Sequence, residues 1–148
     1  MKQNIKYRAW LKNVEEMCEV VGFNFIYETA TVICKDRSTI YMSGEQPLMH
    51  KIFKFDKVEL MQFTGLVDKN DKQIFEGDII EVNHSYKDRY YKGEIIFENG
   101  AFEAKEFYFS HYDNPSDFKE GLEYVEVIGN IYENKSLLED AKWMKVYF

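Results

Sequence analysis

Residues Gly93–Phe109 read GEIIFENGAFEAKEFYF, and this stretch decides the fold. The dipeptide Asn99-Gly100 stands between two runs that are rich in β-branched and aromatic residues. Asn and Gly readily adopt the positive φ angles of a type I′ turn, which joins two antiparallel strands. The stretch therefore predicts a β-hairpin with strands over Gly93–Glu98 and Ala101–Phe109.

Two further stretches predict strands on either side of this hairpin. Ile74–Val82 (IFEGDIIEV) places a Gly-Asp turn before a β-branched run, which is typical of a strand entered through a tight turn. Tyr124–Tyr132 (YVEVIGNIY) predicts a last strand, which we expect to bend at Gly129. Four or five short antiparallel strands leave an apolar face in water unless the sheet closes. We therefore expect a small barrel over residues 58–134.

Residues 1–57 are predicted to form a second, β-rich lobe. The expected strands are Ile5–Trp10, Phe23–Ile33 and Thr39–Met42, with a hairpin turn at Lys35–Ser38 between the last two. Leu11–Val20 fits both helical spacing and a turn followed by a strand, and the two alternatives stay open. Ser43–His50 contains Pro47 and is expected to be a loop.

The composition favours a mainly β fold with minor α content. Aromatic residues make up 17% of the chain, with 12 Phe and 11 Tyr, and such residues favour half-buried strands. Beyond the barrel, Ser136 is expected to cap a short helix in a tail over residues 135–148. The longest apolar runs are a few residues, whereas a membrane-spanning helix needs about 20. We expect no membrane partner.

The N-terminus and the cysteines indicate the cellular compartment. The chain begins with mixed charged and aromatic residues, without the apolar stretch and cleavage site of a signal peptide. We therefore expect a cytoplasmic protein. Cys18 and Cys34 form no C-x-x-C motif, and in the cytoplasm we expect both to be buried, reduced and unreactive thiols.

Charge is distributed unevenly along the chain. The net charge of −7 divides into +2 for residues 1–57 and −9 for residues 58–148. The acidic part argues against a non-specific phosphate-binding surface there and leaves DNA mimicry as one alternative. The first lobe offers basic residues that alternate with aromatic ones and are candidates for nucleic-acid binding: Lys2, Lys6, Arg8, Lys12, Lys35 and Arg37.

Catalytic, cofactor and metal motifs are missing from the sequence. It contains no G-x-S-x-G, G-x-x-x-x-G-K-[ST] or G-x-G-x-x-G pattern, and its three His are widely spaced. Asp68–Lys72 has the start of a calcium loop, but Lys72 stands where the fifth-position ligand belongs, so a solvated turn is expected. Glu76, Asp78 and Glu81 are expected to form an exposed acidic rim. We expect no enzyme activity, no cofactor and no metal.

The segment Tyr86–Lys92 (YKDRYYK) interleaves aromatic and basic residues. This composition suits base stacking and phosphate neutralisation, but it also suits a strand-connecting loop whose lysines extend into water. Glu81, Asp88 and Glu94 weaken the nucleic-acid alternative. We retain Tyr86, Arg89 and Tyr90 as candidate partner-binding residues.

Four motifs in order resemble the YopX family, which is encoded by bacteriophages and prophages, mainly of Gram-positive bacteria. They are Ile5–Trp10 (IKYRAW), Leu60–Asn70 (LMQFTGLVDKN), Ile74–Ile80 (IFEGDII) and Val127–Asn134 (VIGNIYEN). The resemblance extends from about residue 5 to residue 138. It implies an SH3-like type for the C-terminal barrel and self-association, and it carries over no catalytic residue.

The second motif contains the stretch Gln62–Gly65, which we expect to be a turn. Glycines and aromatic residues in such motifs ordinarily encode packing and backbone geometry. The alternative is a recognition surface formed by Gln62 and Thr64. We expect a non-enzymatic phage accessory protein in the bacterial host cytoplasm that binds protein, either as a homo-oligomer or with a host or phage protein. The alternatives are nucleic-acid binding and acidic DNA mimicry.

Overall fold

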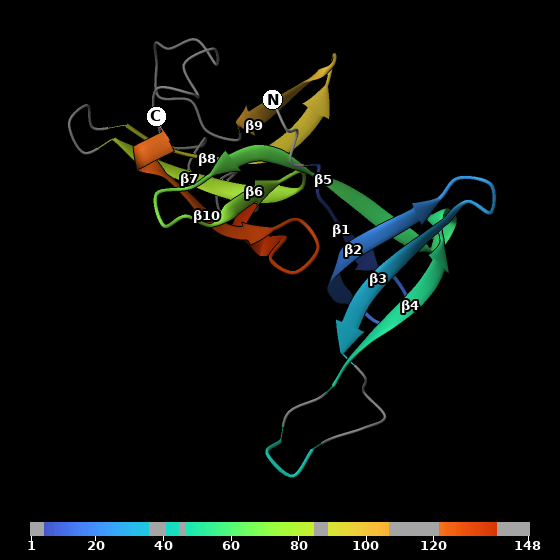
Figure 1. Cartoon of the computed structure of the whole chain (residues 1–148). Helices are drawn as coiled ribbons and strands as arrows, with labels where there is room; N and C mark the ends of the chain where they lie inside the picture. Colours follow the sequence, from blue (N-terminus) through green and yellow to red (C-terminus); the bar gives the residue numbers. More distant parts are fainter. Residues whose placement is uncertain (1–4, 36–40, 45–46, 85–88, 107–121, 139–148) are drawn as a thin grey trace. The chain divides into compact units, whose positions relative to one another are not determined.

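The computed structural model describes residues 5–35, 41–44, 47–84, 89–106 and 122–138 (Figure 1). Within these ranges the chain is mainly β, as expected, and its strands form two antiparallel sheets. The chain divides into two compact units, Met1–Gln62 and Phe63–Phe148. Each unit is described by itself.

The first unit consists of antiparallel strands in the order β4-β3-β2-β1-β5. The strands are β1 (Tyr7–Leu11), β2 (Glu16–Asn24), β3 (Thr29–Lys35), β4 (Leu48–Lys54) and β5 (Val58–Val67), with a 3-10 turn, η1 (Phe55–Lys57), between β4 and β5. Alternate residues point to one face, where they exclude water. The buried residues of that face are Ala9, Leu11, Cys18, Val32, Cys34 and Val58.

Two predictions for the first unit are settled by its turns. Leu11–Val20 is a turn plus a strand: the carbonyl of Leu11 accepts hydrogen bonds from the N–H groups of Val14 and Glu15, at 3.2 and 2.8 Å. The single strand predicted over Phe23–Ile33 is wrong, because residues 25–28 form a turn between β2 and β3.

The partner of β3 also differs from the prediction. Thr39–Met42 was expected to pair there, but β3 pairs with β4 over its whole length, from Thr29↔Lys54 to Lys35↔Leu48. The loop predicted over Ser43–His50 is wrong in its last residues, since β4 begins at Leu48. Of the predicted turn at Lys35–Ser38, residues 36–38 lie outside the described residues.

In the second unit the four-stranded sheet has the order β10-β7-β8-β9. The strands are β7 (Asp78–His84), β8 (Arg89–Glu98), β9 (Ala101–Glu106) and β10 (Val125–Asn130); β6 (Gln73–Phe75) pairs with the second half of β5. The core residues are Ile74, Ile80, Val82, Ile95, Val125 and Val127.

The hairpin and the bend predicted from the sequence are both present. Asn99 and Gly100 have φ angles of 53° and 83°, as a type I′ turn requires. The described part of the returning strand ends at Glu106, so residues 107–109 of the predicted strand lie outside it. At Gly129 the pairing of β10 with β7 shifts register, which is a β-bulge.

Closure of the second sheet is not confirmed. The described strands form an open ladder from β10 to β9, with no pairing between those two strands, so the SH3-like barrel over residues 58–134 stays a prediction. Residues 136–138 form a helical turn, and the rest of the predicted tail lies outside the described residues. In the described ranges, no helix has the length and apolar character that crossing a membrane would need.

Candidate interaction surface

Three consecutive large apolar residues occupy the turn between β2 and β3. Phe25, Ile26 and Tyr27 are 78%, 87% and 65% exposed. Turns are ordinarily built from Gly, Asn, Asp, Ser and Pro because their backbone or side chains favour the geometry. The turn itself therefore does not explain these side chains. We call the three residues the hairpin tip.

Hydrogen bonds hold the backbone of the hairpin tip in place. Oδ1 of Asn24 accepts hydrogen bonds from the N–H groups of Ile26 and Tyr27, at 3.1 and 3.2 Å. Glu28 completes the turn with a φ of 52°. From β4, Nζ of Lys54 donates to the carbonyl oxygen of Tyr27 at 2.6 Å. The tip has a defined shape before any partner binds.

Aromatic rings support the hairpin tip from one side. Phe23 stacks on Phe25 with ring centroids 5.9 Å apart, and both meet Phe55 edge-on at 6.1 and 6.3 Å. Tyr7 meets Phe23 edge-to-face at 5.1 Å. Such pairs contribute about 0.5–1.5 kcal/mol each beyond the area they bury. The ring of Phe25 is thus packed on one side although most of its surface is exposed.

Sequence patterns did not reveal the hairpin tip. Phe, Ile and Tyr all have high strand propensity, and no Gly or Pro interrupts them. The local signal was Asn24, because an Asn side chain that accepts hydrogen bonds from the following N–H groups forms a turn by itself.

The candidate residues Gln62 and Thr64 lie in strand β5, so the turn predicted for Gln62–Gly65 is wrong. The bend there is a register shift between Phe63 and Val67, with Gly65 at a φ of 87°. Gln62 is half-buried, and its Oε1 accepts a hydrogen bond from the Tyr7 hydroxyl at 3.3 Å.

The Thr64 hydroxyl is engaged by its own backbone surroundings. It donates to the carbonyl of Ile74 at 2.8 Å and accepts from the N–H of Leu66 at 3.2 Å. Thr64 therefore stabilises the irregular pairing of β5 with β6. Partner binding by Gln62 and Thr64 stays a prediction.

The other candidate partner-binding residues fall at the start of β8. Arg89 and Tyr90 are its first two residues, and their backbones pair with His84 and Asn83 of β7. Tyr86 lies outside the described residues.

Among the described residues, the basic candidates for nucleic-acid binding in the first lobe do not gather into one cluster. Arg8 lies in β1, opposite Glu19 of β2, and Lys12 forms an ion pair with Glu59 at 2.6 Å. Lys35 ends β3, where its N–H donates to Glu16 at 3.1 Å. Lys6 precedes β1, whereas Lys2 and Arg37 lie outside the described residues.

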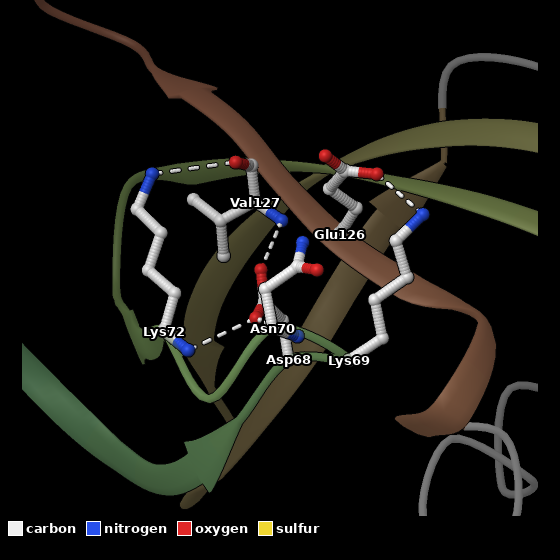
Figure 2. Close-up of polar contacts among 6 residues, drawn as sticks. All are labelled: Asp68, Lys69, Asn70, Lys72, Glu126 and Val127. Carbon is white, nitrogen blue, oxygen red and sulfur yellow. Dashed lines mark hydrogen bonds and ion pairs between the residues drawn. The ribbon is translucent and has the colours of Figure 1, made fainter.

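The solvated turn predicted at Asp68–Lys72 is present, with residues 69–72 exposed, but it is built around the buried carboxylate of Asp68 (Figure 2). Asp68 is 4% exposed. Its Oδ1 accepts from the N–H groups of Asn70 and Lys72, at 2.8 and 3.0 Å, and its Oδ2 from that of Val127 at 2.9 Å. Lys69 forms an ion pair with Glu126. The loop is thereby fastened to β10.

The pKa of Asp68 reflects this environment. Burial would raise it, but hydrogen bonds from the three backbone N–H groups together hold the pKa below its ordinary value. Both carboxylate oxygens are therefore occupied by backbone donors. In the described part of the chain, no three His, Cys, Asp or Glu side chains gather as a metal site would require.

The acidic rim expected from Glu76, Asp78 and Glu81 is wrong for Asp78, which is 1% exposed. Its Oδ2 accepts from the N–H of Phe75 at 2.8 Å, across the turn at Gly77. Glu76 and Glu81 are half-buried. Burial raises the pKa of nearby Glu94, and the charge of Glu76 adds to this rise.

Comparisons with known proteins place the chain in a family. Residues 6–139 match the family model described as YopX protein, and none of the curated proteins matches the chain. The crystal structure of protein EF1440 from Enterococcus faecalis is similar, with 27% identity, a TM-score of 0.57, and coverage of 93% of this chain and 99% of that chain. The structure of protein yopX from Bacillus subtilis, with 20% identity, a TM-score of 0.55 and coverage of 91% and 98%, shows a similar fold. Since the family model spans most of its length, the chain belongs to the YopX family.

Proposed function

We propose that this chain is a non-enzymatic phage or prophage accessory protein of the bacterial cytoplasm that binds protein through the hairpin tip, in the simplest case a second copy of itself. The observation that carries the proposal is the exposure of Phe25, Ile26 and Tyr27 on a backbone held by Asn24 and Lys54. Rigid aromatic anchors lose little conformational freedom on binding and are enriched at the centres of interfaces.

The size of the hairpin tip defines its role. Aromatic side chains bury about 150–250 Å² each, so the tip offers on the order of 400 Å² of apolar surface, worth about 10 kcal/mol at about 25 cal/mol per Å². Association itself costs about 4–15 kcal/mol. The tip is therefore the anchor of an interface, and surrounding contacts are needed for a stable complex.

Two of the acidic residues considered in the sequence are engaged in structure. Asp68 and Asp78 are both buried and both accept backbone hydrogen bonds. A carboxylate held in this way stabilises a turn and is not positioned to transfer a proton to a ligand. These contacts support a binding protein over an enzyme.

The two alternative functions have weaker support. For nucleic-acid binding, the charge of Lys12 is already matched by Glu59. For DNA mimicry, lysines interrupt the acidic surface: Glu81 stands opposite Lys92, and Glu94 opposite Lys105. A continuous negative stripe like that of DNA phosphates is not formed by these strands.

The test replaces Ile26 and Tyr27, the two residues of the hairpin tip that lie outside the group of packed aromatic rings around Phe23. Ile26→Ser with Tyr27→Ser is expected to reduce self-association by at least roughly tenfold, because loss of a central anchor costs more than about 1.4 kcal/mol. The measurement is light scattering coupled to size-exclusion chromatography over a wide range of concentration.

The matched control is Leu48→Ser. Leu48 is 70% exposed and lies opposite Lys35, at the end of β4 away from the tip. This variant is expected to associate like the original chain. A chain that stays monomeric at the highest concentration, or a loss of association equal in both variants, contradicts the proposal.

A further inference from the structure

The two cysteines, separated in the sequence, lie on neighbouring strands of the first unit. Glu19 of β2 pairs with Ile33 of β3, so the next position of the same antiparallel register places Cys18 opposite Cys34. Both side chains point to the buried face, where they are 4% and 3% exposed. The thiol of Cys34 is close enough to Cys18 to add to the rise in the pKa of Cys18 that burial causes.

The strand geometry is close to that of a disulfide. Directly opposite residues of antiparallel strands have Cα atoms about 4.5–5.5 Å apart, and disulfides span Cα separations of about 4.4–6.8 Å. Their Cβ atoms lie about 4.5–5.5 Å apart, against about 3.5–4.5 Å in a disulfide. A shift of roughly 1 Å between the strands is enough to form the bond.

We propose that Cys18 and Cys34 are a redox-modification site, at which a small-molecule disulfide oxidises the pair to an intramolecular bond joining β2 to β3. The inference is independent of the proposed function, because the cysteines lie at the end of these strands away from the hairpin tip.

The reaction proceeds by two thiol–disulfide exchanges. The thiolate of one cysteine attacks a sulfur of the small disulfide, forms a mixed disulfide and releases one thiolate. The thiolate of the second cysteine then attacks the sulfur of the first and releases the other small thiolate. In total both cysteines are oxidised, their two protons leave, and one small disulfide is reduced to two thiols.

Burial controls the rate of this reaction. Burial raises the pKa of Cys18 to about 12, and the neighbouring Cys34 adds to the rise. Little thiolate is present near neutral pH, and Cys34 also donates to the carbonyl of Met49 at 3.9 Å. Oxidation of the native chain is therefore slow. Equilibrium is reached faster when the chain refolds in the presence of the oxidant.

The experiment uses the full chain in buffers of reduced and oxidised glutathione, approached from the reduced native protein and from the reduced unfolded protein. We expect a monomer lighter by two hydrogen atoms in intact-mass spectrometry, with a Cys18–Cys34 cross-link in peptide mapping. Its thermal midpoint should rise by about 5 °C, because the bond restricts the unfolded chain.

Two variants, Cys18→Ala and Cys34→Ala, serve as controls, since neither can form the bond and glutathione should leave their thermal midpoints unchanged. Three results overturn the inference: both thiols stay free after refolding in oxidised glutathione, each cysteine carries glutathione without a cross-link, or the bond joins two chains.

Discussion

At the scale of single residues, Gly129 has no room for a side chain. A Cβ at this position would lie 2.7 Å from Oδ1 and 2.8 Å from Cβ of Asn134. Asn134 cannot withdraw easily, because its N–H donates to the carbonyl of Asn130 at 2.9 Å and its Oδ1 accepts from the Asn130 N–H at 3.2 Å. The bulge and the turn after β10 therefore depend on each other.

Gly129→Ala is expected to lower the free energy of unfolding by about 1–3 kcal/mol, the usual effect of overpacking. Urea denaturation of the full chain measures it. Gly22→Ala is the control, since a Cβ there would meet only Thr31, at 3.9 Å, and should cost less than about 1 kcal/mol. Equal losses in the two variants would show that the contact with Asn134 is unimportant.

Asp68 gives stability a dependence on pH. Its pKa in the folded protein lies below the ordinary value of 3.8, so the ionised carboxylate stabilises the fold at higher pH and this contribution is lost as the pH falls through the folded pKa. Asp68→Asn replaces one acceptor oxygen with a donor and is expected to cost about 1–3 kcal/mol at neutral pH. Urea denaturation at neutral pH and at a pH below 3.8 should show the difference shrinking in acid.

Asp71→Asn is the matched control for this prediction. Asp71 belongs to the same loop, is exposed and has a φ of 61°, a conformation that Asn tolerates well. The substitution removes the same charge and should change stability by less than about 0.5 kcal/mol. If the cost of Asp68→Asn stayed constant across the pH range, the carboxylate would not be the source of the dependence.

At the scale of elements, the hairpin β8–β9 follows from local sequence because its turn chemistry and its strand pattern agree. The positive φ angles at Asn99 and Gly100 are demanded by the turn and supplied by the two residues best suited to it. Gly129 likewise marked the bulge in β10. Both features depend on residues that are close together in the sequence, so the sequence alone was sufficient to predict them.

Gly100→Ala is expected to destabilise this hairpin by about 1 kcal/mol, because a φ of 83° is unfavourable for a residue with a Cβ. Asn99→Gly should change the free energy of unfolding by less than about 0.5 kcal/mol, since glycine also suits a type I′ turn. Denaturant unfolding distinguishes the two variants. A larger cost for Asn99→Gly would mean that the Asn99 side chain, rather than the backbone angle, fixes the turn.

The elements of the first unit that the sequence did not predict depend on distant contacts. β4 begins just after Pro47 in a stretch that lacks clear alternation, and it is a strand because β3 pairs with it along seven positions. The hairpin tip has the propensity of a strand, and the Asn24 and Lys54 side chains make it a turn. The candidate site could therefore not be located from local patterns.

At the scale of the whole molecule, four ordered motifs were sufficient to predict the family, which the match over residues 6–139 confirms. Closure of the second sheet could not be established in the same way. Closure depends on which two edge strands pair with each other. No local sequence pattern in an edge strand identifies the strand that it will pair with. The placement of Cys18 opposite Cys34 could not be predicted either. It follows from the register of β2 and β3 and not from the spacing of the two cysteines in the sequence.

Strand β5 has a consequence for the modularity of this protein. Its first five residues pair with β1, whereas Phe63 and Val67 pair with β6, so one continuous strand completes both units. In a fragment that stops before β5, strand β1 would lack one of its two neighbouring strands. A fragment that starts after Gln62 would begin in the middle of β5. Neither unit can therefore be inserted intact into another protein unless the inserted fragment also contains strand β5.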